Sequence, residues 1–155
     1  MTETFGEGTV DIVRTFDAPR TLVWQAWTDP KMMAGWFGPR QFTSSVPEYD
    51  VRVGGKLKIV MHRPDGNDYP MKGVFQEVSP PEKLVFSNVA IDNDGNHLLE
   101  GETTVTLTEQ GGKTTMRVQS RAVGRVPIAP QMLAGMNAGW TQSIDKMEEL
   151  VAKAA

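Results

Sequence analysis

The fold of this chain is decided by its last stretch, PQMLAGMNAGWTQSIDKMEELVAKAA, residues 130–155. Large apolar residues recur there at helical spacing: Met132 or Leu133, then Met136, Trp140, Ile144, Met147 and Val151. Charged residues occupy the other side of the same helical projection. This period predicts one long amphipathic helix from about Pro130 to the end of the chain. Its apolar stripe needs a large apolar surface to cover it.

That surface is a sheet predicted from the middle of the chain, where β-forming residues alternate with polar ones. The expected strands are Thr9 to Phe16, Phe42 to Val53, Lys56 to Arg63, Tyr69 to Val78, Lys83 to Ile91, Glu102 to Thr108 and Thr114 to Val123. Turn sequences such as Pro64-Asp65-Gly66 separate them, which favours antiparallel hairpins. Pro47 indicates an edge strand or a bulge, because proline cannot donate to a strand ladder.

Two short helices are expected between the first two strands. Asp17 to Thr28 forms the first, with Asp17 as its cap and Pro19 in its first turn. The second starts at Pro30, with Thr28 or Asp29 as cap, and ends at Gly38-Pro39. The sequence therefore predicts an α+β fold in one domain, residues 1–155, with a curved antiparallel sheet around a long C-terminal helix.

Composition narrows the classes of function. The net charge is -3 and no dense run of Lys and Arg occurs, so a nucleic-acid partner is not expected. The chain has no Cys, which excludes disulfides and thiolate chemistry and is compatible with a reducing cytoplasm. The polar N-terminal segment lacks the pattern of a secretion signal, and no stretch predicts membrane insertion. We expect a soluble cytoplasmic protein.

Several motifs occur in the order known from one superfamily. They are Phe16-Asp17-Ala18-Pro19-Arg20, Val23-Trp24-Gln25-Ala26-Trp27-Thr28-Asp29-Pro30, Trp36-Phe37-Gly38-Pro39, Arg52-Val53-Gly54-Gly55, Pro64-Asp65-Gly66, Pro80-Pro81-Glu82-Lys83-Leu84-Val85-Phe86 and Gly139-Trp140. In these residues the chain resembles the SRPBCC superfamily (START-like, polyketide cyclase-like and pollen-allergen-like proteins), and within it the branch related to the activator of heat-shock-protein-90 ATPase. The resemblance implies a helix-grip fold with an internal cavity and leaves the activity open. Similar proteins often carry an aromatic residue near Asn88.

Candidate ligand-binding residues follow from the predicted inward positions. They are Trp36, Phe42, Arg52, Met61, Met71, Phe75, Phe86, Met136, Trp140 and Ile144. Trp36 stands beside Gly38-Pro39, which suits the lip of a cavity. Flexible methionines suit a surface that accepts varied apolar shapes, and Arg52 suits a carboxylate or phenolate on a ligand. Ordinary core packing is the alternative for the apolar residues, and a solvated salt bridge is the alternative for Arg52.

No catalytic constellation or metal site stands out. His62 and His97 are the only imidazoles, and neither belongs to a metal-binding motif, so no metal and no cofactor are expected. A Ser-His-Asp arrangement remains geometrically open, although no Ser occurs in a nucleophile-elbow sequence.

Three functions are compatible with these observations. The first is a binding protein that holds a hydrophobic or aromatic small molecule between the sheet and the C-terminal helix. The second is a cyclase-like or hydrolase-like enzyme that uses polar cavity groups such as Glu48, Tyr49, Arg52 or Glu77. The third is a protein-interaction module, either a homodimer or a regulator of a chaperone ATPase, with an apolar patch around Ile128-Ala129-Pro130.

Overall fold

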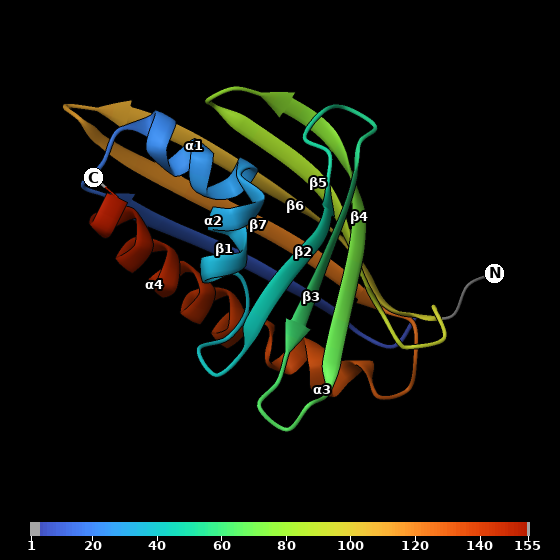
Figure 1. Cartoon of the computed structure of the whole chain (residues 1–155). Helices are drawn as coiled ribbons and strands as arrows, with labels where there is room; N and C mark the ends of the chain where they lie inside the picture. The colour runs from blue at the N-terminus through green and yellow to red at the C-terminus, as the bar shows by residue number, and fades with distance from the viewer. Residues whose placement is uncertain (1–3, 155) are drawn as a thin grey trace.

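Seven strands and four helices make up the part of the chain that the structure, a computed structural model, describes: residues 4–154 (Figure 1). The strands are β1 (Glu7–Phe16), β2 (Thr43–Tyr49), β3 (Lys56–His62), β4 (Asp68–Ser79), β5 (Lys83–Ile91), β6 (His97–Gln110) and β7 (Lys113–Gly124). The helices are α1 (Arg20–Thr28), α2 (Pro30–Trp36), α3 (Ala129–Ala134) and α4 (Met136–Ala154). The predicted α+β class is confirmed.

All seven strands belong to one antiparallel sheet with the order β1-β7-β6-β5-β4-β3-β2. Consecutive strands from β2 to β7 are neighbours, as hairpin connections require, and β1 closes the far side against β7. The helices lie on one face of this curved sheet, which we call the inner face (Figure 1). The arrangement agrees with the expected helix-grip fold.

The edge strand β2 contains the expected irregularity. Its pairing with β3 shifts register between Ser45 and Glu48, on either side of Pro47. Because β2 is the last strand of the sheet, the missing proline N–H interrupts only one ladder. The prediction of an edge strand with a bulge is confirmed.

Two glycines of the sheet allow close approaches of the backbone. A Cβ atom on Gly73 of β4 would lie 1.8 Å from the Ser87 carbonyl oxygen, and one on Gly101 of β6 would lie 2.0 Å from that of Arg121. No side chain fits at such distances, so both positions require glycine.

Helix α1 begins later than the sequence predicts. Asp17 does not cap it, because the helix starts at Arg20 and Pro19 is the residue at its N-cap, without a side-chain hydrogen bond. The cap of α2 is as expected, since the Asp29 side chain accepts a hydrogen bond from the Lys31 backbone N–H. Proline can start a helix without losing a backbone bond, which explains why α1 begins beside Pro19 rather than at Asp17.

The expectation of a single C-terminal helix is wrong. The segment divides into α3 and α4 at Gly135, whose N–H bonds back to the Met132 carbonyl oxygen at 3.2 Å and closes α3. Glycine has the weakest helix propensity after proline, so the chain can turn there at little cost. The apolar stripe itself is correct, because Ile144, Met147 and Val151 of α4 are buried. Ala155 lies outside the described residues.

The core is aromatic where α1 and α2 meet the sheet. Trp27 and Trp36 are fully buried, with ring centroids 4.8 Å apart in an edge-on arrangement. The Trp36 indole donates to the Ala26 carbonyl oxygen at 2.8 Å, and the Trp27 indole contacts the Met116 sulfur at 3.2 Å. These contacts join two helices to β7 across the inner face.

The helices within residues 4–154 fall short of the length and apolar character that a membrane crossing needs.

Candidate functional site

The structure divides the ten candidate residues into three groups by burial. Trp36, Phe75, Phe86 and Ile144 are fully buried; Phe42, Met61, Met71, Met136 and Trp140 are half-buried; Arg52 is exposed. The first group belongs to the aromatic core, where the side chains pack against one another. The second group borders the core and keeps part of its apolar surface accessible.

The half-buried residues Met61 and Met71 belong to a continuous row across the inner face. Met61 of β3 pairs with Tyr69 of β4, Met71 of β4 pairs with Ala90 of β5, and Ala90 pairs with Leu99 of β6. Residues directly opposite in adjacent strands share a face, so these five side chains point to the same side. We call them the inner row. All five are half-buried.

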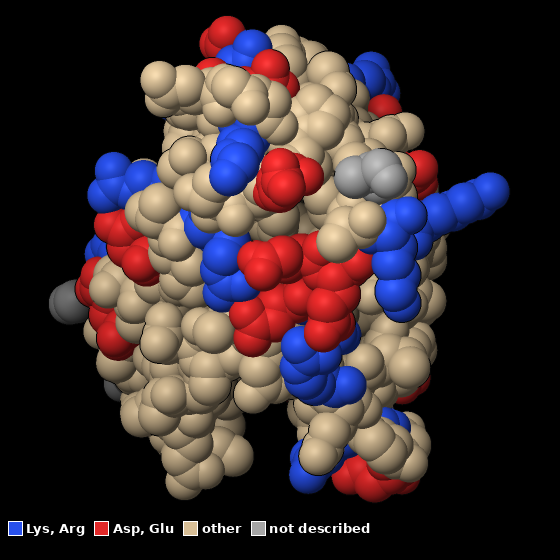
Figure 2. All heavy atoms as spheres, turned by 90° about the vertical axis from the view of Figure 1, so that its left-hand side faces the viewer, with Lys and Arg blue, Asp and Glu red and all other residues tan. Residues whose placement is uncertain are grey.

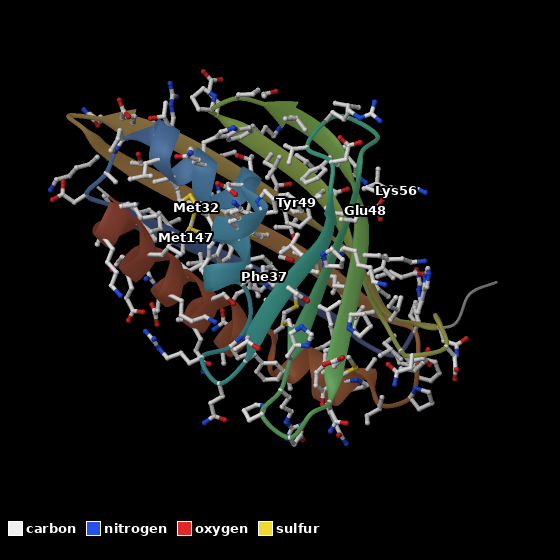
Figure 3. The ribbon with its side chains drawn as sticks, viewed as in Figure 1. Met32, Phe37, Glu48, Tyr49, Lys56 and Met147 are labelled. Atoms are coloured by element: carbon white, nitrogen blue, oxygen red, sulfur yellow. The ribbon has the colours of Figure 1, made fainter. Side chains whose placement is uncertain are left out.

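The segment after α2 approaches the inner row at Gly38, which lies beside the Met61 sulfur, and α4 packs on the neighbouring aromatic core. Trp140 of α4 stacks on Trp27 with ring centroids 6.2 Å apart and meets Phe37 edge-on at 5.9 Å. Phe37 follows the last residue of α2, beside β2 (Figure 3). On the strand side, the rings of Phe42 and Tyr69 are 5.7 Å apart. Trp140 is therefore a half-buried residue at the margin of the aromatic core.

A line of hydrogen bonds runs beside the inner row across three strands. The Asn88 side-chain oxygen lies 2.8 Å from the Thr103 hydroxyl, which lies 2.9 Å from the Ser120 hydroxyl. Because the Thr103 proton is given to Asn88, the Ser120 hydroxyl donates to Thr103. The line ends at Asn88, whose two amide N–H groups take no part in it.

The Asn88 amide nitrogen faces space that solvent can enter. Within residues 4–154 it has no hydrogen-bond partner, and no fully buried side-chain nitrogen or oxygen lacks one. An amide nitrogen without a partner is therefore not sealed from solvent. Asn88 points to the inner face, since its strand neighbours Phe86 and Ala90 have the same parity. The Asn88 amide thus keeps some access to solvent on the inner face.

The charged groups named as cavity groups in the sequence analysis lie on the surface instead. Arg52 is exposed and bonds to Asp50 at 2.7 Å, and Glu77 pairs with Lys83 at 3.5 Å. Glu48 is also exposed and, as Figure 3 shows, lies on the side of β2 away from Tyr49. Arg52 is therefore not grouped with the other candidates, and the alternative of a solvated salt bridge holds for it.

Tyr49 points from β2 toward α1, where its hydroxyl donates to the Trp27 carbonyl oxygen (Figure 3). Burial raises the pKa of this phenol well above its ordinary value, so it stays protonated at neutral pH. With its proton committed to a backbone carbonyl, Tyr49 serves as a structural link between β2 and α1.

Figure 2 shows a group of carboxylates bordered by basic side chains on the face that carries α4. Arg14 of β1 bonds to Asp145 of α4 at 2.8 Å. Arg40 bonds to Glu149 at 2.9 Å and holds the pKa of that carboxyl below its usual range. These pairs fasten α4 to β1 and to the segment after α2.

Two depressions are lined by other residues. One, of about 550 Å³, lies over β1, β7 and β6 and includes Asp11, Glu100, Glu102 and Arg121. The other, of about 510 Å³, lies between α2 and α4 and includes Met32 and Leu150. None of the ten candidates lines either of them. No three His, Asp or Glu side chains of residues 4–154 come together as a metal site.

Sequence reasoning missed several members of this region. Tyr69, Ala90, Leu99, Thr103 and Ser120 were not among the candidates, although each belongs to an expected or extended strand. The available signal was the alternation of inward and outward positions along each strand, counted from Met71 and Phe86. This alternation can be carried from one strand to the next only when the register between the strands is known, and turn sequences alone leave that register undetermined.

Comparisons with known proteins agree with the fold. Residues 17–152 match the family model described as "Activator of Hsp90 ATPase homolog 1-like protein". A solution structure of a protein from Arthrobacter aurescens is 26% identical, with a TM-score of 0.83 over 94% of this chain and 86% of that one. A crystal structure from Mycobacterium smegmatis is also 26% identical, with a TM-score of 0.71 over 92% and 87% of the two chains.

A protein from Chromobacterium violaceum is 24% identical, with a TM-score of 0.77 over 93% of this chain and 96% of that one, and supports the fold alone. None of the curated proteins compared with the chain matched it.

Proposed function

Because this chain belongs to the family of activator of Hsp90 ATPase homolog 1-like proteins, within a superfamily of cavity-forming folds, we propose that it binds an apolar small molecule on its inner face. The proposed site lies between the inner row of the sheet and Trp140 of α4. The observation that carries the proposal is the Asn88 amide nitrogen, which has no hydrogen-bond partner within residues 4–154, is not fully buried and points to the inner face beside apolar side chains.

The chemistry of the region favours a ligand with an apolar body and one hydrogen-bond acceptor. Met61, Met71 and Leu99 offer adaptable apolar surface, and Trp140 offers a flat aromatic face. The Asn88 amide can donate to a carbonyl or carboxylate oxygen on such a ligand. A few placed polar groups in a mostly apolar lining are typical of small-molecule sites.

Binding of 1-anilinonaphthalene-8-sulfonate, which combines an aromatic body with an anionic acceptor, tests the proposal. We expect saturable fluorescence enhancement with the purified chain and displacement by aromatic ketones or medium-chain fatty acids. Ala90→Phe places a large ring in the inner row and should weaken probe binding by about tenfold or more, since one ring removes the space of several methylene contacts.

The matched control is Val13→Phe, which adds the same ring at an exposed position of β1, where Val13 is 61% accessible. It should bind the probe like the wild type. Two results would count against the proposal: no saturable binding to the wild-type chain, or equal binding by the wild type and Ala90→Phe. A large loss of stability in Ala90→Phe would show instead that the inner row is already filled.

Protein interaction has one supporting feature, the exposure of Ile128 before α3, as the sequence suggested. Val13, Val53 and Val74 are the other large exposed apolar residues of the described chain, and they lie on β1, the β2–β3 turn and β4. Scattered single residues do not form the contiguous patch that a stable interface needs. Small-molecule binding is therefore the better-supported function.

A further inference from the structure

Three side chains on the outer face of the sheet form a line of hydrogen bonds. The Ser45 hydroxyl lies 2.8 Å from Nε2 of His62, and Nδ1 of His62 lies 2.7 Å from Oδ1 of Asp68. They come from the three adjacent strands β2, β3 and β4. The residues of this outer-face triad, as we call it, are 17 and 6 positions apart in the sequence.

The direction of each bond follows from the carboxylate. An ionised Asp68 can only accept, so the neutral imidazole carries its proton on Nδ1. Nε2 then has a free lone pair and accepts from the Ser45 hydroxyl. The order of roles is that of a nucleophile, a base and a group that orients the base.

Strand pairing fixes the three side chains in place. His62 is directly opposite Asp68 in the β3–β4 pairing. Thr43 of β2 is opposite His62 on the other side, which places Ser45 two residues along the same face. Ser44, the neighbour of Ser45, faces inward, where its hydroxyl donates to the Phe37 carbonyl oxygen. Sites carried on strands hold their geometry better than sites on loops.

The triad is accessible and includes a residue of the edge strand β2. The His62 and Asp68 side chains are 38% and 53% exposed, and Ser45 is also exposed. β2 is an edge strand, and no described strand pairs with its free edge. Some backbone N–H groups of β2 near Ser45 therefore point away from the sheet. Backbone N–H groups are the usual donors to the oxyanion that forms during acyl transfer.

We propose that Ser45, His62 and Asp68 form an acyl-transfer site that hydrolyses short carboxylic esters. Nε2 of His62 takes the Ser45 proton while Oγ bonds to the ester carbonyl carbon. The carbon–oxygen bond to the leaving group then breaks, and His62 returns the proton to the departing alkoxide. Water, activated by the same nitrogen, cleaves the acyl-serine and restores the hydroxyl. Asp68 is a positioning residue that holds the imidazole tautomer.

The open position of the triad sets the substrate class. Solvent surrounds the nucleophile, so charge stabilisation is weaker than in a closed site. The triad lines neither of the two depressions described above. Short esters with good leaving groups are the substrates that such a site can turn over.

Hydrolysis of p-nitrophenyl acetate by the intact chain tests the proposal. We expect Ser45→Ala to lower the rate at least tenfold. The control Ser87→Ala removes a serine whose hydroxyl forms hydrogen bonds with the Val74 backbone, and it should keep the wild-type rate. An alkyl fluorophosphonate should modify Ser45 in the wild type, seen by peptide mass spectrometry, and should leave it unmodified in His62→Gln.

A bare imidazole also reacts with this ester, which makes the Ser45 variant decisive. Equal rates for Ser45→Ala and the wild type, or no phosphonate on Ser45, would overturn the proposal.

The role of Asp68 has its own test. Asp68→Asn should lower kcat with little change in KM and should shift the imidazole ¹⁵N resonances of His62. Unchanged kcat and resonances would remove Asp68 from the triad. Because the site lies on the outer face, Ala90→Phe should keep the esterase activity even if it loses ligand binding.

Discussion

Trp36 illustrates how one residue can satisfy a structural demand that resembles a binding role. The sequence places it beside Gly38-Pro39, a position that suits the lip of a cavity. In the structure its ring is fully buried against Trp27, and its indole N–H is given to the Ala26 carbonyl oxygen. Both its apolar surface and its donor are used within the protein.

Replacing Trp36 should therefore affect stability. Trp36→Ala leaves a cavity and an unpaired carbonyl, and we expect a loss of about 3–5 kcal/mol in the free energy of unfolding. Trp24→Ala, at a half-buried position of α1, should cost clearly less. Urea unfolding followed by circular dichroism measures both. Equal costs for the two variants would contradict the packing described for Trp36.

The elements of the fold differ in how far local sequence determines them. Alternation and turn residues predicted the strands and their antiparallel hairpins, and Pro47 predicted an edge strand or a bulge, because each acts through the local backbone. The start of β6 at His97, well before the expected Glu102, depends on pairing with β5 and β7, which adjacent residues do not encode. The break at Gly135 was missed because the apolar stripe continues across it.

The candidate site divides in the same way. Parity identified Met61 and Met71 as inward-facing, and this can be read from a single strand. Which inward residues are sealed depends on how far Trp27 and Trp36 fill the inner face, and that is a property of packing between elements. The Ser45–His62–Asp68 line needs the register of three strands, so no local motif indicates it.

Alanine substitutions at Gly101 of β6 and at Gly135 between α3 and α4 should change the free energy of unfolding in opposite directions. Gly101→Ala forces a methyl group to within 2.0 Å of the Arg121 carbonyl oxygen, so the strands must separate, at a cost of about 1–3 kcal/mol or more. At Gly135 the nearest atom to such a methyl is 3.8 Å away and φ is -88°. Gly135→Ala should raise stability by up to about 1 kcal/mol.

Thermal unfolding of the two glycine variants and the wild type measures this difference. The pair is matched, since each variant adds one methyl group and no charge. Destabilisation by Gly135→Ala as large as that by Gly101→Ala would mean that the break between α3 and α4 needs glycine for another reason.

At the scale of the whole molecule, helices and sheet share one core. Trp27 of α1 contacts Met116 of β7, Phe86 of β5 lies 6.3 Å from the Trp27 ring, and Ile144 of α4 is fully buried. Ion pairs such as Arg14 with Asp145 add a second connection between β1 and α4. Neither layer can bury its apolar face without the other, which makes independent unfolding of the layers costly.

We therefore expect a single cooperative unfolding transition. All four tryptophans lie on helices, so tryptophan fluorescence reports on the packing of the helices. Far-ultraviolet circular dichroism reports on the secondary structure of the sheet and the helices together. Tryptophan fluorescence and circular dichroism should give coincident urea curves, because loss of helix packing opens the core that the sheet needs. An earlier fluorescence transition would show that α4 and the α1–α2 pair leave a sheet that remains folded. The inner face would then be reached by helix opening, and ligand binding should shift the earlier transition to higher urea.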